Sequence, residues 1–349
     1  MSPPLEVTEH AVKAGSHTTF YLAAGPSDGP LIVFVHGWPE LAISWRHQLP
    51  AFAALGFRAV APDMRGYGRS SVYRTHEAYA LENIVGDMIA LIDSLGRERA
   101  VWVGHDWGSP VVWSIASHHP DRCAGVANLC VPYYTLERGL EPCLELINRD
   151  IYPADQYPAG QWEYQLHYQE DFDGATRAME SNPYNLVKLL FRKGDPSGFG
   201  LPSGTAMVRR NGGWFGANMP SMPRDDDVVT EADVSAYASA LTRNGFFGPN
   251  SYYMNHAANG AYAARAANGG YLDMPVLFVA AQYDYTCECI TSRLAEPMRK
   301  YCRRLSETVV YSGHWMAQEK PLDVNAAIVR WLATTVSDLW PVARAGASQ

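Results

Sequence analysis

Residues Gly104–Gly108 read GHDWG and join an apolar, strand-like run, Ala100–Val103, to a helical stretch, Ser109–His118. A small residue two positions before a central nucleophile and another two positions after it, at such a strand-to-helix turn, expose the nucleophile at the end of the strand. The glycines suit a turn so tight that larger side chains would clash. The central residue is Asp106. A carboxylate is suited to displacing a leaving group at a saturated carbon, which forms an ester that water must then cleave.

Five further apolar runs predict strands, and helical patterns lie between them. The strand-like runs are Leu31–Val35, Phe57–Ala61, Gly125–Val131, Pro275–Ala280 and Glu307–Tyr311, and the other helical patterns are Trp45–Leu55, Tyr79–Leu95 and Asp323–Val336. Continuous apolar runs are typical of parallel strands that are buried on both faces. The alternation predicts an α/β fold with a doubly wound, mostly parallel sheet.

The alternation stops at Pro132 and resumes only at Pro275, a gap far too long for a loop. The intervening stretch is rich in Tyr, Asn, Gly and Pro and has only weak helical patterns. We expect residues 132–255 to form a mostly helical lid, or cap, that is inserted into a core of residues 1–131 and 256–349.

Composition and charge exclude several classes of protein. The chain has 349 residues, 47% hydrophobic and 18% charged, which suits one large globular core with an insertion. Its net charge of −8 argues against nucleic acid and anionic membrane surfaces as partners, because both need basic patches. No apolar run is long enough for a transmembrane helix, and the N-terminus lacks the pattern of a secretory signal.

Six cysteines are sparse for this length, so a disulfide framework is not expected. Their spacings, that of Cys287 and Cys289 included, do not match a zinc site. We therefore expect reduced, mostly buried thiols in a cytoplasmic protein that has neither a metal nor an organic cofactor.

A nucleophilic aspartate needs a base that activates water and an acid that orients the base. Asp284 and His314 each follow one of the last two strand-like runs. They are therefore expected at the carboxyl ends of strands, where open α/β sheets build their sites. We expect His314 to take a proton from water, and Asp284 to hold the imidazole and stabilise its charged form. Asp273 and Glu288 are weaker candidates for the acid.

The first strand-like run ends in HGWP at residues 36–39. A backbone N–H from this loop and the N–H that follows the nucleophile make the oxyanion hole of such sites, so we expect the donors to be Trp38 and Trp107. The residues expected to line an apolar substrate pocket are His36, Pro39, His105 and Trp315. We also expect a cis peptide bond before Pro39.

Four motifs taken together resemble the epoxide hydrolases of the α/β-hydrolase fold, and the resemblance spans most of the core. The motifs are HGWP at 36–39, DMRGYGRS at 63–70, GHDWG at 104–108 and GHW at 313–315. The resemblance implies that Asp106 opens an epoxide as an alkyl ester, which water activated by His314 and Asp284 then hydrolyses to a vicinal diol. Its substrates would be a small apolar epoxide and water. The motif at 63–70 is expected to be structural.

In epoxide hydrolases of this family, two lid tyrosines donate hydrogen bonds to the epoxide oxygen. The resemblance matches Tyr164, in WEYQ at 162–165, and Tyr253, in SYYMN at 251–255. Tyr252 and Tyr168 are the alternative donors. A phenol is uncharged near neutrality and can donate to the departing oxygen, which stays on the product and needs a proton.

Two other functions compete with epoxide hydrolysis. Haloalkane dehalogenases share the Asp-His-Asp plan but hold a halide, typically with indole N–H donors; Trp107 fits one such donor, and no lid residue is clearly the second. A ligand-binding or catalytically silent member of the fold is the alternative from another class, and the intact set of Asp106, His314 and Asp284 argues against it. An exposed face of the lid is a candidate surface for a homodimer.

Overall fold

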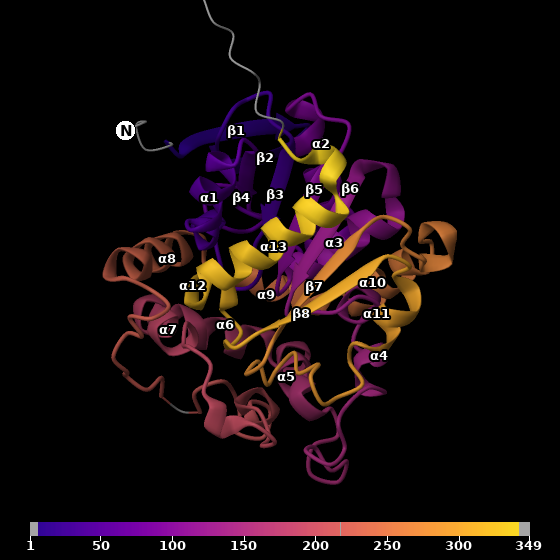
Figure 1. Cartoon of the computed structure of the whole chain (residues 1–349). Coiled ribbons are helices and arrows are strands. Elements are labelled where there is room, and N and C mark those ends of the chain that lie inside the picture. The colour runs from indigo at the N-terminus through magenta and orange to yellow at the C-terminus, as the bar shows by residue number, and fades with distance from the viewer. Residues whose placement is uncertain (1–5, 217, 342–349) are drawn as a thin grey trace, which may run out of the picture.

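The computed structural model describes residues 6–216 and 218–341, and its centre is an eight-stranded sheet (Figure 1). The strand order is β1-β2-β4-β3-β5-β6-β7-β8. β2 pairs antiparallel with both β1 and β4, and all other neighbours pair in parallel. The strands are β1 Thr8–Ala14, β2 His17–Ala24, β3 Leu31–Val35, β4 Arg58–Pro62, β5 Ala100–His105, β6 Cys123–Leu129, β7 Val276–Ala281 and β8 Leu305–Val310.

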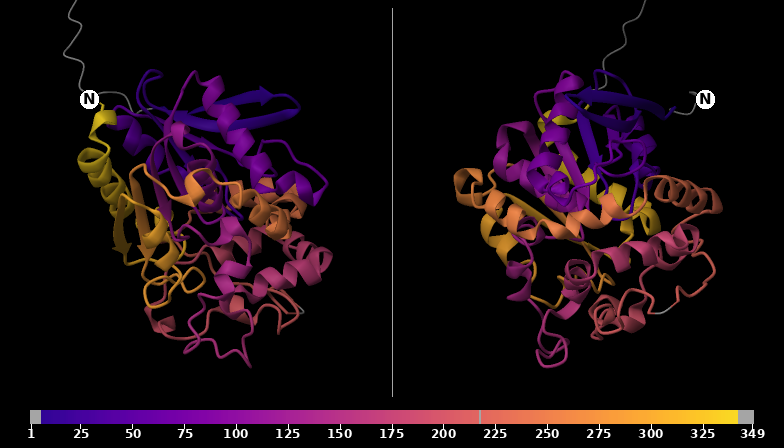
Figure 2. Two further views of the ribbon diagram at one scale, coloured as in Figure 1. Left: turned by 90° about the vertical axis from the view of Figure 1, so that its right-hand side faces the viewer. Right: turned by 180° about the vertical axis from the view of Figure 1, so that it is seen from behind.

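Helices cover both faces of the sheet, so the predicted doubly wound α/β fold is confirmed (Figures 1 and 2). α1 and α13 contact each other on one face, and α2 and α3 contact each other on the opposite face. The helices are α1 Gln48–Ala54, α2 Leu81–Ser94, α3 Gly108–His118, α4 Glu141–Leu144, α5 Glu163–Glu170, α6 Phe172–Glu180, α7 Pro183–Leu190, α8 Glu231–Asn244, α9 Phe247–Ser251, α10 His256–Ala263, α11 Glu296–Tyr301, α12 Met316–Glu319 and α13 Pro321–Thr335.

The central strands form where the sequence has continuous apolar runs. Every residue of β3, β5, β6 and β7 is buried, because helices pack against both faces of these strands. The hairpin of β1 and β2 was not predicted. β1 lies at the edge of the sheet and carries no fully buried residue, only half-buried and exposed ones. Such a strand has no continuous apolar run that could reveal it in the sequence.

Between β6 and β7, the described residues form helices and turns and no strand. Figure 1 shows α5, α6 and α7 of this segment toward one end of the molecule, whereas α10 contacts α2 beside the sheet. Asp171, Asn182 and Thr230 cap α6, α7 and α8 by accepting backbone N–H groups of the first turn. Side-chain caps satisfy N–H groups that have no partner within the helix, which explains how segments with weak helical patterns form helices here.

Within the described part of the chain, no helix is long and apolar enough to cross a membrane. All six cysteines are free and buried, as predicted. Burial raises the pKa of Cys143 and of Cys287 well above the usual range of a thiol, so both stay protonated and unreactive.

Candidate active site

Asp106 lies at the turn between β5 and α3 with a φ of 49°, in the left-handed region. Few residues other than glycine adopt this conformation, and it is typical of functional sites. The glycines around it have no room for a side chain. A Cβ atom at Gly37 would overlap the Asp106 side chain, and one at Gly108 would overlap the carbonyl oxygen of Val35. Close packing of the backbone therefore presents the carboxylate at the end of the sheet.

His314 follows β8 and lies between two carboxylates. Its Nδ1 is 2.7 Å from Oδ2 of Asp284, and its Nε2 is 3.4 Å from Oδ2 of Asp106. Burial alone would lower the pKa of His314, but the Asp284 charge and hydrogen bonds to Asp106 and Asp284 raise it well above the ordinary value. Burial would raise the pKa of Asp284, yet the charge and hydrogen bond of His314 lower it to about 2. His314 is thus an imidazolium while Asp106 is a free carboxylate.

The two weaker candidates for the acid are engaged elsewhere. Asp273 is exposed and pairs with Arg303 at 2.8 Å. Glu288 accepts hydrogen bonds from the backbone N–H groups of residues 290–292 and so closes its own loop. Asp284, by contrast, is buried beside His314, and its second oxygen accepts the N–H groups of Thr286 and Cys287.

The backbone N–H of Trp38 donates to Oδ1 of Asp106 at 2.6 Å. Its peptide bond to Pro39 is cis, as expected. Among the described residues, no hydrogen bond joins the Trp107 N–H to Asp106; the Trp107 ring packs edge-on against Tyr253, with centroids 5.2 Å apart. Oδ1 is held by this short hydrogen bond, whereas Oδ2 has only the longer ion pair of 3.4 Å with Nε2 of His314, so Oδ2 is the freer oxygen to attack a substrate.

Tyr164 of α5 and Tyr253, in the turn after α9, both line the cavity that contains Asp106. Their rings lie 5.6 Å apart at 77°. Gln165 donates from Nε2 to the Tyr164 oxygen at 3.0 Å, which leaves the phenol proton free to be donated. The alternatives are engaged elsewhere: the Tyr252 hydroxyl donates to the carbonyl of Arg65 at 3.0 Å, and that of Tyr168 contacts Met179 Sδ at 3.6 Å.

The cavity has a volume of about 160 Å³ and a mostly aromatic wall. Its lining residues are Trp38, Asp106, Tyr164, Leu190, Thr205, Trp214, Tyr253, Thr286, His314 and Trp315. Trp315 is thus part of the wall, as expected, whereas His36, Pro39 and His105 are not. Leu190, Thr205, Trp214 and Thr286 were not singled out in the sequence. Of these, only Trp214 has a local signal that could have found it, because it is an aromatic residue among Gly212, Gly213 and Gly216.

His105 lies behind the nucleophile rather than in the cavity wall. Its Nδ1 is 2.8 Å from Oε2 of Glu40, and its Nε2 is 2.7 Å from the carbonyl oxygen of His314. Both ring nitrogens face acceptors, so both carry a proton and the ring is charged. Burial would lower the pKa of His105, but the Glu40 carboxylate raises it to about 10. His105 and Glu40 therefore form a buried ion pair that supports the backbone of the base.

His36 is also buried, and it has a structural role. Its Nδ1 donates to the carbonyl of Gly37, and its Nε2 accepts the N–H of Met64, both at 2.9 Å. Asp63 accepts the N–H groups of Ala42 and Arg69, each at 2.9 Å. The motif at 63–70 thus fixes the loop that follows β3, which agrees with the structural role expected for it.

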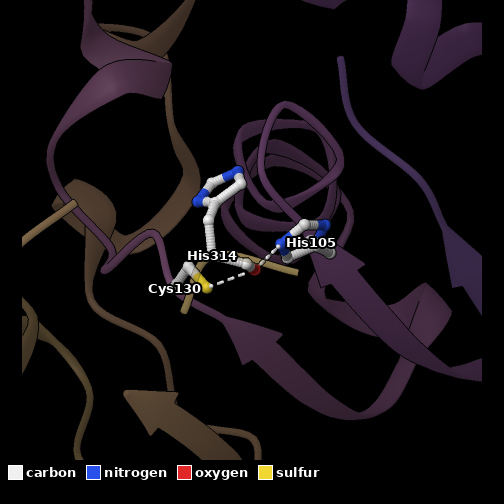
Figure 3. Close-up of side chains that lie close together, drawn as sticks. All are labelled: His105, Cys130 and His314. Atoms are coloured by element: carbon white, nitrogen blue, oxygen red, sulfur yellow. Dashed lines mark hydrogen bonds between the residues drawn. The ribbon is translucent and has the colours of Figure 1, made fainter. Parts of the chain in front are cut away.

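Two clusters of potential metal ligands surround the base within the described residues: His105, Cys130 and His314, and Asp284, Cys287 and His314. Figure 3 shows that His105 and Cys130 both point at the carbonyl oxygen of His314, while the His314 ring turns away from them. In the second cluster, Asp284 is already bonded to His314. Since His105, Cys130 and Asp284 already form hydrogen bonds with His314, we assign no metal to either cluster.

Comparison with known proteins agrees with this geometry. The model of the alpha/beta hydrolase fold family matches residues 30–321. The chain is 34% identical to epoxide hydrolase B of Mycobacterium tuberculosis, over 89% of this chain and 94% of that protein. It is 33% identical to bifunctional epoxide hydrolase 2 of Sus scrofa, over 88% of this chain and 52% of that protein.

Among solved structures, epoxide hydrolase A from Mycobacterium thermoresistibile superposes with a TM-score of 0.77 at 30% identity, covering 94% of this chain and 99% of that one. Epoxide hydrolase VrEH1 from Vigna radiata gives a TM-score of 0.69 at 28% identity, covering 94% and 98%. The chain therefore belongs to the alpha/beta hydrolase fold family, and it is similar over most of its length to epoxide hydrolases of that family.

Proposed function

We propose that this chain hydrolyses an apolar epoxide to a vicinal diol. The observation that carries the proposal is the meeting of Asp106, Tyr164 and Tyr253 in one small aromatic cavity, with His314 and Asp284 beside the carboxylate. A nucleophile and two phenol donors supply what ring opening needs: attack at carbon and a proton for the oxygen.

In the first step Oδ2 of Asp106 attacks an epoxide carbon, the ring C–O bond breaks, and an alkyl ester forms. The ring oxygen stays on the substrate and takes a proton from Tyr164 or Tyr253. Burial raises the pKa of both phenols well above the usual value, so both reach this step protonated. His314 then returns a proton to the phenol and becomes neutral.

That last transfer follows from electrostatics. Hydrogen bonding to the Asp106 carboxylate helps to raise the pKa of His314. Esterification removes the negative charge of Asp106, so the imidazolium loses one of its two partners and its pKa falls. His314 therefore becomes a neutral base only after the ester has formed. Until the ring has opened it stays protonated and can supply a proton.

In the second step neutral His314 takes a proton from water, and the hydroxide attacks the ester carbonyl carbon of Asp106. Negative charge develops on Oδ1, where the Trp38 N–H already donates. Preorganised N–H donors at a developing oxyanion stabilise such a transition state. We keep Trp107 as the expected second donor once the ester carbonyl has formed. Collapse of the tetrahedral intermediate breaks the C–O bond to the alkyl oxygen. The leaving alkoxide takes the proton of the added hydroxyl, which releases the diol and restores the carboxylate, with His314 again an imidazolium.

The same cavity disfavours dehalogenation. Three indoles line it, and two of them donate their N–H groups elsewhere: Trp38 to Oδ1 of Asn250 at 3.1 Å, and Trp315 to the carbonyl of Leu190 at 2.5 Å. Holding a halide would need such donors free, and of these three indoles only Trp214, whose buried Nε1–H has no hydrogen-bond partner among the described residues, is left to act as one. The phenols, by contrast, suit an oxygen that must be protonated.

We further propose that residues 132–255 act as a lid over a core formed by residues 1–131 and 256–349. Four residues of this segment supply much of the cavity wall, which supports the idea: Tyr164, Thr205, Trp214 and Tyr253.

We also propose a cytoplasmic location, because the six thiols are free. A homodimer that forms through the face of the lid is retained as a proposal.

Diol formation from racemic styrene oxide, with the wild type and Asp106→Asn measured side by side, tests the function. We expect diol from the wild type and none from freshly prepared Asp106→Asn. Halide release from haloalkanes without any diol would favour dehalogenation. Saturable ligand binding without turnover of either substrate class would favour a silent member of the fold.

A further inference from the structure

Two threonine hydroxyls interrupt the aromatic wall of the cavity. Thr205 belongs to the short helical turn Gly204–Met207, and Thr286 belongs to the loop after β7. Neither takes part in the two steps described above. In a mostly apolar pocket, a few placed polar groups fix the orientation of the ligand, so these hydroxyls are candidates for substrate recognition.

Hydrogen bonds and close packing hold the segments that carry the two threonines next to each other. The Ser203 N–H donates to the Tyr152 oxygen at 3.0 Å, and the Tyr285 hydroxyl donates to the Asp195 carbonyl at 2.6 Å. A Cβ atom at Gly198 would lie 2.5 Å from the Tyr285 ring, so only glycine allows the segment to approach so closely. The segment 195–205 is thus seated on the loop that carries Thr286.

The Thr286 hydroxyl has weaker hydrogen bonds within the protein than the Thr205 hydroxyl. Oγ of Ser203 and Oγ1 of Thr205 are 2.9 Å apart, a good hydrogen bond. Oγ1 of Thr286 is 3.4 Å from the first and 3.5 Å from the second, and both distances are long for a bond between hydroxyls. Among the described residues, the Thr286 side chain has no other hydrogen-bond partner. Its proton is therefore available to a ligand.

Thr286 also lies close to the catalytic residues. Its backbone N–H donates to Oδ1 of Asp284 at 3.1 Å, and Oδ2 of the same carboxylate is bonded to His314. The position of the threonine is thereby fixed relative to the base. Thr286 lines the same small cavity as Asp106 and the two tyrosines, so its hydroxyl is within the space that a substituent of a bound epoxide would occupy.

We propose that the Thr286 hydroxyl, with Thr205 beside it, is a subsite for a hydrogen-bond-accepting oxygen on the substituent of the epoxide. The preferred substrates are then epoxides with an ether or carbonyl oxygen near the ring, rather than pure hydrocarbon epoxides. This inference rests on the proposed function, and it names the substrate class of that site.

Phenyl glycidyl ether and 4-phenyl-1,2-epoxybutane test the subsite, because they differ only in an ether oxygen replaced by a methylene. The quantity to measure is the ratio of their kcat/KM values. In Thr286→Val this ratio should fall about three- to tenfold from the wild-type ratio, the range expected for one neutral hydrogen bond. Thr286→Ser retains the hydroxyl and should stay within about twofold of the wild type.

Thr205→Val is the matched control. Its hydroxyl is already bonded to Ser203, so its loss should lower the ratio less than Thr286→Val does. An equal fall in both variants would overturn the assignment to Thr286, and an unchanged ratio in Thr286→Val would overturn the subsite. Both substrates are measured on one sample, so loss of folded protein cancels, and Thr286→Ala replaces the valine variant if that does not fold. Absence of diol from either substrate with wild-type enzyme would instead contradict the proposed function.

Discussion

His105 donates from Nε2 to the carbonyl oxygen of His314 at 2.7 Å, and so joins the inner side of the nucleophile turn to the backbone of the base. Its other nitrogen is bonded to Glu40, which also accepts the N–H of Gly37 and the side-chain amide of Gln318. Glu40 and His105 are each 1% exposed, so their charges depend on each other for compensation. This pair supports the loop after β3, the nucleophile turn and the base together.

The ion pair leads to a prediction about stability. Glu40→Gln and His105→Gln each leave one buried charge without its partner, which costs about 3–5 kcal/mol in the free energy of unfolding. The double variant removes both charges and should lose clearly less than the sum of the single losses. Urea unfolding of the four proteins checks this. Strictly additive losses would show that the two residues are not coupled.

The same pair predicts how stability varies with pH. The pKa of Glu40 falls from 4.5 to about 2 on folding, so its contribution is present above pH 4.5 and is lost as the pH falls toward 2. The pKa of His105 rises from 6.5 to about 10, so its contribution is present below pH 6.5 and is lost as the pH rises toward 10. The urea midpoint of the wild type should decline in both windows.

The Glu40→Gln/His105→Gln variant is the control for that experiment, because neither of its new side chains titrates. The urea midpoint of this variant should decline less than that of the wild type in each of the two pH windows. If the urea midpoints of the two proteins varied with pH in the same way, Glu40 and His105 would not titrate as described.

The lid tyrosines predict a graded loss of activity. Tyr164→Phe and Tyr253→Phe should each slow ring opening about tenfold to a hundredfold, since one phenol can still donate, and the double variant should lose at least about a thousandfold. Tyr252→Phe makes the same chemical change at a hydroxyl bonded to the Arg65 carbonyl, and it should change kcat less than about threefold. Steady-state diol formation is the measurement. Full activity in the double variant would refute the assignment of the donors.

Removal of the base should separate the two steps. In His314→Gln the carboxylate can still attack, but no group activates water, so the alkyl ester should accumulate. We expect epoxide to be consumed at about one equivalent per enzyme molecule, with little diol formed. Mass spectrometry should find the added mass on the peptide that contains Asp106. Sustained turnover without an adduct would argue against His314 as the base.

The nucleophile and its partners could be predicted because they sit in short motifs at the ends of continuous apolar strands. Asp106, Asp284 and His314 each follow a run that can be recognised without tertiary information, and the parallel sheet brings the three ends together. The phenol donors Tyr164 and Tyr253 and the oxyanion donor Trp38 were expected from the chemistry of a carboxylate nucleophile and from the family resemblance.

Much of the cavity wall could not be predicted. Leu190, Thr205 and Trp214 lie in an insertion whose path depends on tertiary packing rather than on local pattern. His105 was misplaced because neighbours in sequence lie on opposite sides of a strand. His36 follows β3 and is turned into the interior by its bonds to Gly37 and Met64. Glu40 gave no signal, since an acidic residue is expected to be exposed unless its partner is known.

The most direct test of the covalent mechanism is a single turnover in oxygen-18 water with enzyme in excess over epoxide. If Asp106 attacks first, the oxygen added to the diol comes from the unlabelled carboxylate. The first diol should therefore contain no label, and the label should appear in the peptide that carries Asp106. Labelled diol and an unlabelled Asp106 would mean that water attacks the epoxide directly, and would contradict the account.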